Sequence, residues 1–166
     1  MDDDRWDDLD RRVRALEGRL PAPVPVPDDD RFWALAGLAD DAAAAPGGAV
    51  VYAGQVRLPG GEQYAWQRTH GALDSRGGPD TDAGTAAALA ALAHPVRLRL
   101  LREVLSGTRA TADLAALPGL GTTGQLHHHL RQLTGAGWLR TTTRGSYDVP
   151  AERVVPLHVV LAAVSS

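Results

Sequence analysis

Three consecutive histidines, His127, His128 and His129, lie in the segment TTGQLHHHL at residues 122–130. Imidazole side chains bind zinc and transfer protons near neutral pH, so this triplet is the first place to look for chemistry. On a helix, however, neighbouring side chains point about 100° apart, and ligands of one ion need spacings of three or four residues. We therefore do not expect the triplet alone to bind a metal ion.

The residues around the triplet predict an amphipathic helix. Leu126, Leu130 and Leu133 fall on one side, which should face a core, and His129 lies within about 60° of them. We expect His129 at the edge of the core, satisfied by one hydrogen bond. The residues on the other sides of this helix are Gly124, Gln125, His127, His128 and Arg131.

The flanking segments predict a short helix before this one and a β-hairpin after it. TADLAALPGLG (111–121) gives a helix of about two turns with Thr111 as its cap. Thr122 or Thr123 caps the next helix, which ends near Gly135 and Gly137. Two helices around a tight turn describe a helix-turn-helix. WLRTTT and SYDVP, joined by Arg144-Gly145, then complete a winged helix.

Upstream, TAAALAALAHPVRLRLLREVLSG predicts a short helix, a break at His94-Pro95, and a longer helix that ends at Gly107. At the other end, PLHVVLAAVSS predicts a short apolar helix without a polar face. We expect this last helix to be buried, for instance between two subunits.

Residues 86–160, approximately, resemble the ArsR-type winged-helix transcription regulators. The resemblance rests on ALAHPVRLRLLREVL (91–105), ADLAALPGLGTTGQLHHHLRQLTGAGWL (112–139) and RTTTRGSY (140–147). It implies a dimeric DNA-binding repressor that a metal or another inducer often releases. The family's metal motifs need Cys, or a second ligand after a histidine of the last helix. This chain has no Cys and only His158 in that helix, so we expect no metal and no cofactor.

Residues 1–80 do not share the resemblance. WDDLDRRVRALEGRL predicts an amphipathic helix, whose heptad-spaced apolar residues are Trp6, Leu9, Val13, Leu16 and Leu20. This stripe packs either on its own domain or on a twin helix across a dimer. PAPVPVP (21–27) follows, as an extended spacer or a ligand for a proline-binding partner.

A second helix, capped by Asp30, and a β-hairpin complete the N-terminal region. The helix RFWALAGLADDAAAA should pack through Phe32, Leu35, Ala36, Leu38 and Ala39. GAVVYAGQVRL and EQYAWQRTH, joined by Pro59-Gly60-Gly61, form the hairpin, which must pack on this helix or on a partner. We place Val51, Val56, Tyr64 and Trp66 on one face. Tyr52, Tyr64 and Trp66 either pack as part of a β face or form the binding site of an inducer. Residues 73–84 should be a loop that separates domains 1–80 and 81–166.

The distribution of charge also separates an N-terminal part of the chain from a C-terminal part. Residues 1–93 carry nine Arg against sixteen acidic residues, whereas residues 94–166 carry eight Arg against four. A locally basic region favours a polyanionic partner. The acidic start MDDDRWDD and the absence of long apolar runs favour a cytoplasmic protein without a membrane segment. Because no catalytic motif is present, we do not expect an enzyme.

Together these patterns predict an α+β, mainly α, protein: a winged helix-turn-helix with an added N-terminal helix and hairpin region. The expected function is transcription regulation by a homodimer on double-stranded DNA, with residues 122–134 in the major groove. The expected DNA contacts are Thr122, Thr123, Gly124, Gln125, His127, His128, Arg131, Arg140 and Arg144. Alternatively, the winged helix is a protein-interaction module that binds no DNA, with the N-terminal region contacting a protein partner.

Overall fold

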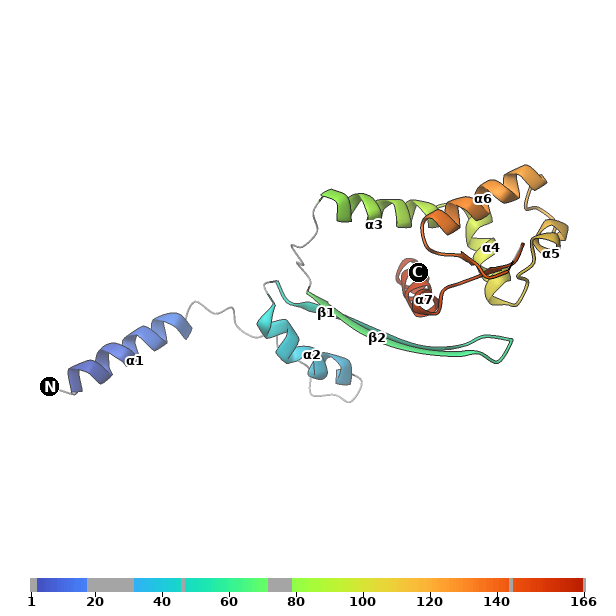
Figure 1. Ribbon diagram of the computed structural model, residues 1–166. Helices are drawn as coiled ribbons and strands as arrows, with labels where there is room; N and C mark the ends of the chain where they lie inside the picture. The colour runs from blue at the N-terminus through green and yellow to red at the C-terminus, as the bar shows by residue number, and fades with distance from the viewer. Residues whose placement is uncertain (1–2, 18–31, 46, 72–78, 144, 166) are drawn as a thin grey trace.

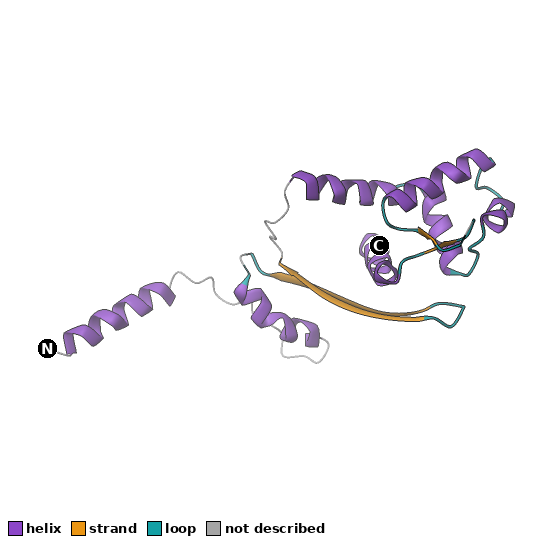
Figure 2. Cartoon of the chain, in the orientation of Figure 1, coloured by secondary structure: helices purple, strands orange, loops and turns teal. Residues whose placement is uncertain are grey.

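The computed structural model describes residues 3–17, 32–45, 47–71, 79–143 and 145–165. These residues form an α+β, mainly helical fold with two separate antiparallel hairpins, as predicted (Figures 1 and 2). The N-terminal elements are α1 (Asp3–Glu17), α2 (Trp33–Ala44), β1 (Ala49–Arg57) and β2 (Gln63–Gly71). The C-terminal elements are α3 (Pro79–Leu92), α4 (Pro95–Leu105), α5 (Thr111–Ala116), α6 (Thr123–Gly135), β3 (Arg140–Thr141), β4 (Tyr147–Asp148) and α7 (Ala151–Val164).

One hydrophobic core joins the helices from α3 to α7. Its largest fully buried side chains are Leu100 and Leu101 on α4, Leu114 on α5, Leu126, Leu130 and Leu133 on α6, and Leu157 on α7. Val56 and Tyr64 of the long hairpin pack against the same cluster. The proposed division at residue 80 therefore does not separate two independent cores, because hairpin residues complete the core of the C-terminal half.

The break between α3 and α4 follows the expected chemistry. His94 caps α4, and its Nδ1 accepts a hydrogen bond from the backbone N–H of Val96 at 3.1 Å. Pro95 occupies the first turn, where no backbone N–H is needed. Helix α3 is longer than expected: it begins at Pro79, so residues 79–84 are helical and not a loop. A proline is favoured at the first position of a helix, where no backbone N–H is needed, and this preference agrees with the earlier start.

Strands β1 and β2 pair in a regular register, with Val56 opposite Tyr64 and Gly54 opposite Trp66. Because side chains alternate along a strand, Val51 lies on the opposite face from Val56. The prediction that Val51 shares a face with Val56, Tyr64 and Trp66 was wrong for this reason. Trp66 does share the face of Tyr64, but it stays exposed.

The long hairpin packs on two helices, one on each face. It passes below α7 in the view of Figure 1, and β1 and β2 both contact that helix. Helix α2 packs on the hairpin as expected, but only Leu38 of its predicted apolar face is buried, while Phe32 and Leu35 are exposed. The hairpin is too narrow to cover the whole face of a helix.

Helix α7 is longer than predicted, since it begins at Ala151 and holds Pro156 within it. Val154 and Leu157 reach the core, and Val155 faces the hairpin at Gly54. Hairpin residues of the same chain thus cover part of the face that we expected between subunits.

The first two helices differ from expectation at their ends. Helix α2 begins at Trp33, and Phe32 is its N-cap residue without a side-chain hydrogen bond. On α1, Trp6, Leu9 and Val13 are exposed, so these three residues of the stripe do not pack on the rest of the described chain. The expected cap Asp30, the proline segment 21–27, Leu20 and the side chain of Leu16 lie outside the described residues.

Candidate nucleic-acid interface

Helices α5 and α6 are joined by residues 117–122, and the start of α5 is hydrogen-bonded to the turn of the short hairpin β3–β4. Both the backbone N–H and the hydroxyl of Thr111 donate to the carbonyl of Gly145, each at 2.8 Å. Thr111 is therefore not the cap of α5: Ala110 holds that position without a side-chain bond. The hydroxyl instead ties the start of α5 to the hairpin turn, a pairing that sequence spacing alone does not reveal.

The N-terminus of α6 is closed by a capping box. The Oγ1 of Thr122 accepts a hydrogen bond from the N–H of Gln125 at 3.3 Å, and Oε1 of Gln125 accepts one from the N–H of Thr122 at 2.8 Å. Reciprocal bonds of this kind satisfy two helix-end donors and fix where the helix starts. They also occupy the carbonyl oxygen of Gln125, which bidentate recognition of adenine would require. Gln125 is thus less available for base contact than we expected.

The remaining residues of α6 divide as the sequence predicts. Leu126, Leu130 and Leu133 are buried, whereas the other side of the helix is exposed. Its exposed residues include Thr123, Gly124, His127, His128 and Arg131. Within the described residues, Arg131 forms no ion pair, so its charge is available to a partner.

His129 lies at the edge of the core, but it lacks the hydrogen bond that we expected. Its ring packs against His94, with 4.6 Å between the ring centroids, and against His128 at 5.7 Å. Its buried Nδ1 has no hydrogen-bond partner in the part of the chain that the structure describes. Burial lowers the pKa of His129 below its ordinary value, and the nearby charges of His94, Arg97 and His128 lower it further.

The short hairpin pairs Arg140 with Asp148 and Thr141 with Tyr147. The guanidinium of Arg140 also lies 3.3 Å from the Asp148 carboxylate, so this predicted DNA contact is partly neutralised within the chain. Arg144, the other predicted contact of the hairpin, lies outside the described residues.

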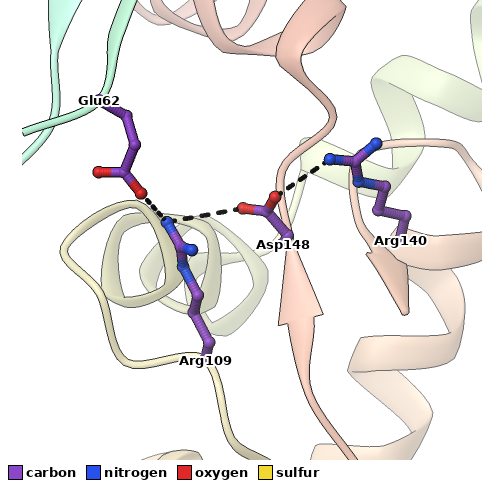
Figure 3. A network of polar contacts seen from close by, with 4 residues as sticks. All are labelled: Glu62, Arg109, Arg140 and Asp148. Atoms are coloured by element: carbon purple, nitrogen blue, oxygen red, sulfur yellow. Dashed lines mark hydrogen bonds and ion pairs between the residues drawn. The ribbon is translucent and has the colours of Figure 1, made fainter. Parts of the chain in front are cut away.

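A polar network that the sequence did not reveal joins the two hairpins (Figure 3). Nη2 of Arg109 lies 2.6 Å from Oε1 of Glu62, in the turn of the long hairpin, and 3.9 Å from Asp148 of the short one. The pKa of Glu62 is lowered by a backbone hydrogen bond and by Arg109, while the Glu62 hydrogen bond raises the pKa of Arg109. The network therefore links the turn of the long hairpin, the segment before α5 and the short hairpin.

The three aromatic residues of the long hairpin have different surroundings. Tyr64 packs against the core, which agrees with the first of the two expectations for these residues, packing and not inducer binding. Trp66 is exposed. Tyr52 stacks on His70, with 6.0 Å between ring centroids, and borders a cavity beside α3 and α7. Of the three, only Tyr52 borders this cavity.

No protein-family model matches the sequence, and a search of curated proteins finds no match either. Within the described residues, no three His, Asp or Glu side chains gather closely enough to hold a metal ion, and no helix could span a membrane.

Proposed function

We propose that this protein is a sequence-specific DNA-binding transcription regulator whose residues 81–166 form a winged helix of the ArsR type. In this proposal α6 is the recognition helix, which lies in the major groove, and the hairpin β3–β4 is the wing on the flanking backbone. The single observation that carries the proposal is the division of α6. Three leucines fix one side in the core, and the other side exposes polar and basic groups from its first turn onward.

The exposed side chains suit this role individually. Arg131 is free to pair with phosphate or guanine, and Thr123 can meet a phosphate or a thymine methyl group. His127 and His128 supply hydrogen-bond donors, and Gly124 lets the backbone come close to the DNA. The oxygen of Gln125 is held by the capping box, so we assign that residue to positioning of the helix end and reduce its part in base recognition.

The protein would act as a homodimer in the cytoplasm. The exposed stripe of Trp6, Leu9 and Val13 on α1 supports this part, because a heptad-spaced apolar face is stabilised by pairing with a second helix. Two copies would place two recognition helices on neighbouring turns of the duplex, with half-sites about 34 Å apart.

Fluorescence anisotropy tests DNA binding directly. The full-length protein would be titrated into a labelled duplex from upstream of its own gene and into a scrambled duplex, at several salt concentrations. We expect saturable binding that prefers the upstream duplex, with an affinity that falls linearly with salt on logarithmic axes. Absence of binding to both duplexes by the folded protein would overturn the proposal.

The second candidate function is a winged helix that binds a protein and no DNA. The observation that favours it is the internal use of two predicted DNA contacts, the Arg140 charge and the Gln125 oxygen. This candidate predicts no salt-dependent binding to any duplex, so the same titration separates the two.

A further inference from the structure

A cavity of about 470 Å³ lies where the long hairpin, α3 and α7 meet. Its walls come from Tyr52 on β1, from Thr85 and Leu89 on α3, and from Val160 on α7. Trp138, which is almost fully buried, and Arg153 also border it. This volume falls within the range of about 300–1,000 Å³ in which proteins bind small molecules.

The walls of the cavity are largely apolar, but they contain one cationic group. Ala88, Leu89, Pro156, Val159 and Val160 supply aliphatic surface along α3 and α7. The polar groups are the hydroxyls of Tyr52, Thr81 and Thr85 and the guanidinium of Arg153. Among the described residues that line the cavity there is no carboxylate, and the neighbouring Asp82 and Glu152 are exposed. The cavity therefore presents one positive charge within an apolar surface.

The Arg153 guanidinium keeps its hydrogen-bonding capacity. It lies over the Trp138 ring, with 5.1 Å between its central carbon and the ring centroid. A cation–π contact uses the face of the guanidinium and leaves the N–H groups at its edge free. Among the described residues, Arg153 forms no ion pair and no side-chain hydrogen bond. Two parallel N–H groups at such an edge match the two oxygens of a carboxylate.

We propose that this cavity binds a small amphiphilic monocarboxylate, with the carboxylate on Arg153 and the apolar tail along Leu89, Val159 and Val160. One cation matches a single negative charge, while the aliphatic walls disfavour strongly hydrated anions such as free phosphate. The hydroxyls of Thr81, Thr85 and Tyr52 can accept or donate the remaining hydrogen bonds.

The cavity is also connected to α6. Trp138 follows the end of that helix, and its indole N–H donates to the carbonyl of Ala88 on α3 at 2.9 Å. A carboxylate on Arg153 would lie beside this link. The ligand could change DNA affinity only if the proposed function is correct, whereas ligand binding itself does not depend on that function. The following experiment therefore measures only binding.

Isothermal titration calorimetry of the full-length protein with octanoate, and with 1-octanol as the uncharged counterpart, tests the proposal. We expect octanoate to bind one site per chain more tightly than octanol. Arg153→Gln should weaken octanoate binding about tenfold or more, because a charge-assisted hydrogen bond is lost, and leave octanol binding unchanged. Arg153→Lys keeps the positive charge but loses the two parallel N–H groups, so its octanoate affinity should lie between those of the wild type and Arg153→Gln. Arg102→Gln removes an exposed arginine of α4 that does not line the cavity, so it should bind as the wild type does.

Four results would overturn the proposal. The first is no octanoate binding by the folded wild-type protein. The second is equal affinity for octanoate and octanol, and the third is unchanged octanoate affinity in Arg153→Gln. The fourth is a dimer that excludes octanoate and dissociates in Leu89→Arg, which would assign the cavity to an interface between two copies.

Discussion

Nη2 of Arg109 lies 2.6 Å from Oε1 of Glu62, although 47 residues separate them in sequence. The contact connects the turn of the long hairpin with the segment between α4 and α5. Asp148 extends it to the short hairpin, where Arg140 completes the network (Figure 3). Through these ion pairs, the N-terminal hairpin is part of the structure that supports the candidate DNA-binding surface.

Replacement of Glu62 by Gln should change the acid sensitivity of folding. The pKa of Glu62 is lowered in the folded protein, so its contribution to stability is present above the ordinary value of 4.5 and is lost as pH falls through the folded pKa. Urea denaturation between pH 7 and pH 3 measures this. Wild type should lose more stability over that interval than Glu62→Gln. A control, Glu152→Gln, changes an exposed carboxylate of α7 and should resemble wild type. Identical pH profiles for all three proteins would contradict the account.

The contact between β1 and α7 requires a glycine at position 54. A Cβ placed there would lie only 2.7 Å from Cγ1 of Val155. Gly54→Ala should therefore cost about 1–3 kcal/mol in the free energy of unfolding through overpacking. Gly37→Ala on α2, where a Cβ meets open space, should be neutral or stabilise by about 0.5–1 kcal/mol.

The double variant Gly54→Ala/Val155→Ala makes the test specific. Val155→Ala removes the methyl group that would clash. The double variant should therefore lose less unfolding free energy than the sum of the losses in the two single variants, by about 0.5–3 kcal/mol. Strict additivity in chemical denaturation would show that the hairpin does not pack against α7 at this point.

Thr122 and Thr123 are neighbours, but only Thr122 caps α6. Thr122→Ala should destabilise the protein by about 1 kcal/mol, because the first turn loses a hydrogen-bond acceptor. Thr123→Ala should change stability by less than about 0.5 kcal/mol, since its side chain is exposed. Thermal unfolding followed by circular dichroism compares them. Equal losses in the two variants would refute the capping box.

Folding stability should also fall below about pH 6.5 because of His129. Its pKa is lowered from the ordinary 6.5, so the unfolded chain binds the proton more readily than the folded one. Stability then decreases as pH drops below that value and levels off below the folded pKa. His129→Gln should flatten this dependence. His127→Gln changes an exposed residue two positions away on the same helix and should keep the pH dependence of the wild type. If His129→Gln also kept that dependence, its assignment to His129 would be contradicted.

Local patterns predicted much of this structure from sequence. The spacing of Leu126, Leu130 and Leu133 predicted the buried side of α6, and Pro95 predicted the start of α4; both predictions are confirmed. These features depend on neighbours within one or two helical turns, which a sequence displays directly.

Features that depend on distant contacts were missed. The bond between Thr111 and Gly145 crosses 34 residues, and only the folded chain brings the two together. Val51 differs from the prediction because side chains alternate along a strand, which puts residues 51 and 56 on opposite faces of the hairpin. In the sequence, only the position of Glu62 in a turn pointed toward the network around Arg109. An acidic residue in a turn is usually just solvated, so this position did not predict a distant ion pair.

The most direct test of the central claim compares two arginine variants for binding to the upstream duplex. Arg131 lies on the exposed side of α6, whereas Arg68 is exposed on β2, away from that helix. Each change to Gln removes one positive charge, so any general electrostatic effect is shared. We expect Arg131→Gln to lose about 1–3 kcal/mol of binding free energy and Arg68→Gln to bind nearly as well as wild type. Equal affinities for the two folded variants would contradict the assignment of α6 as the recognition helix.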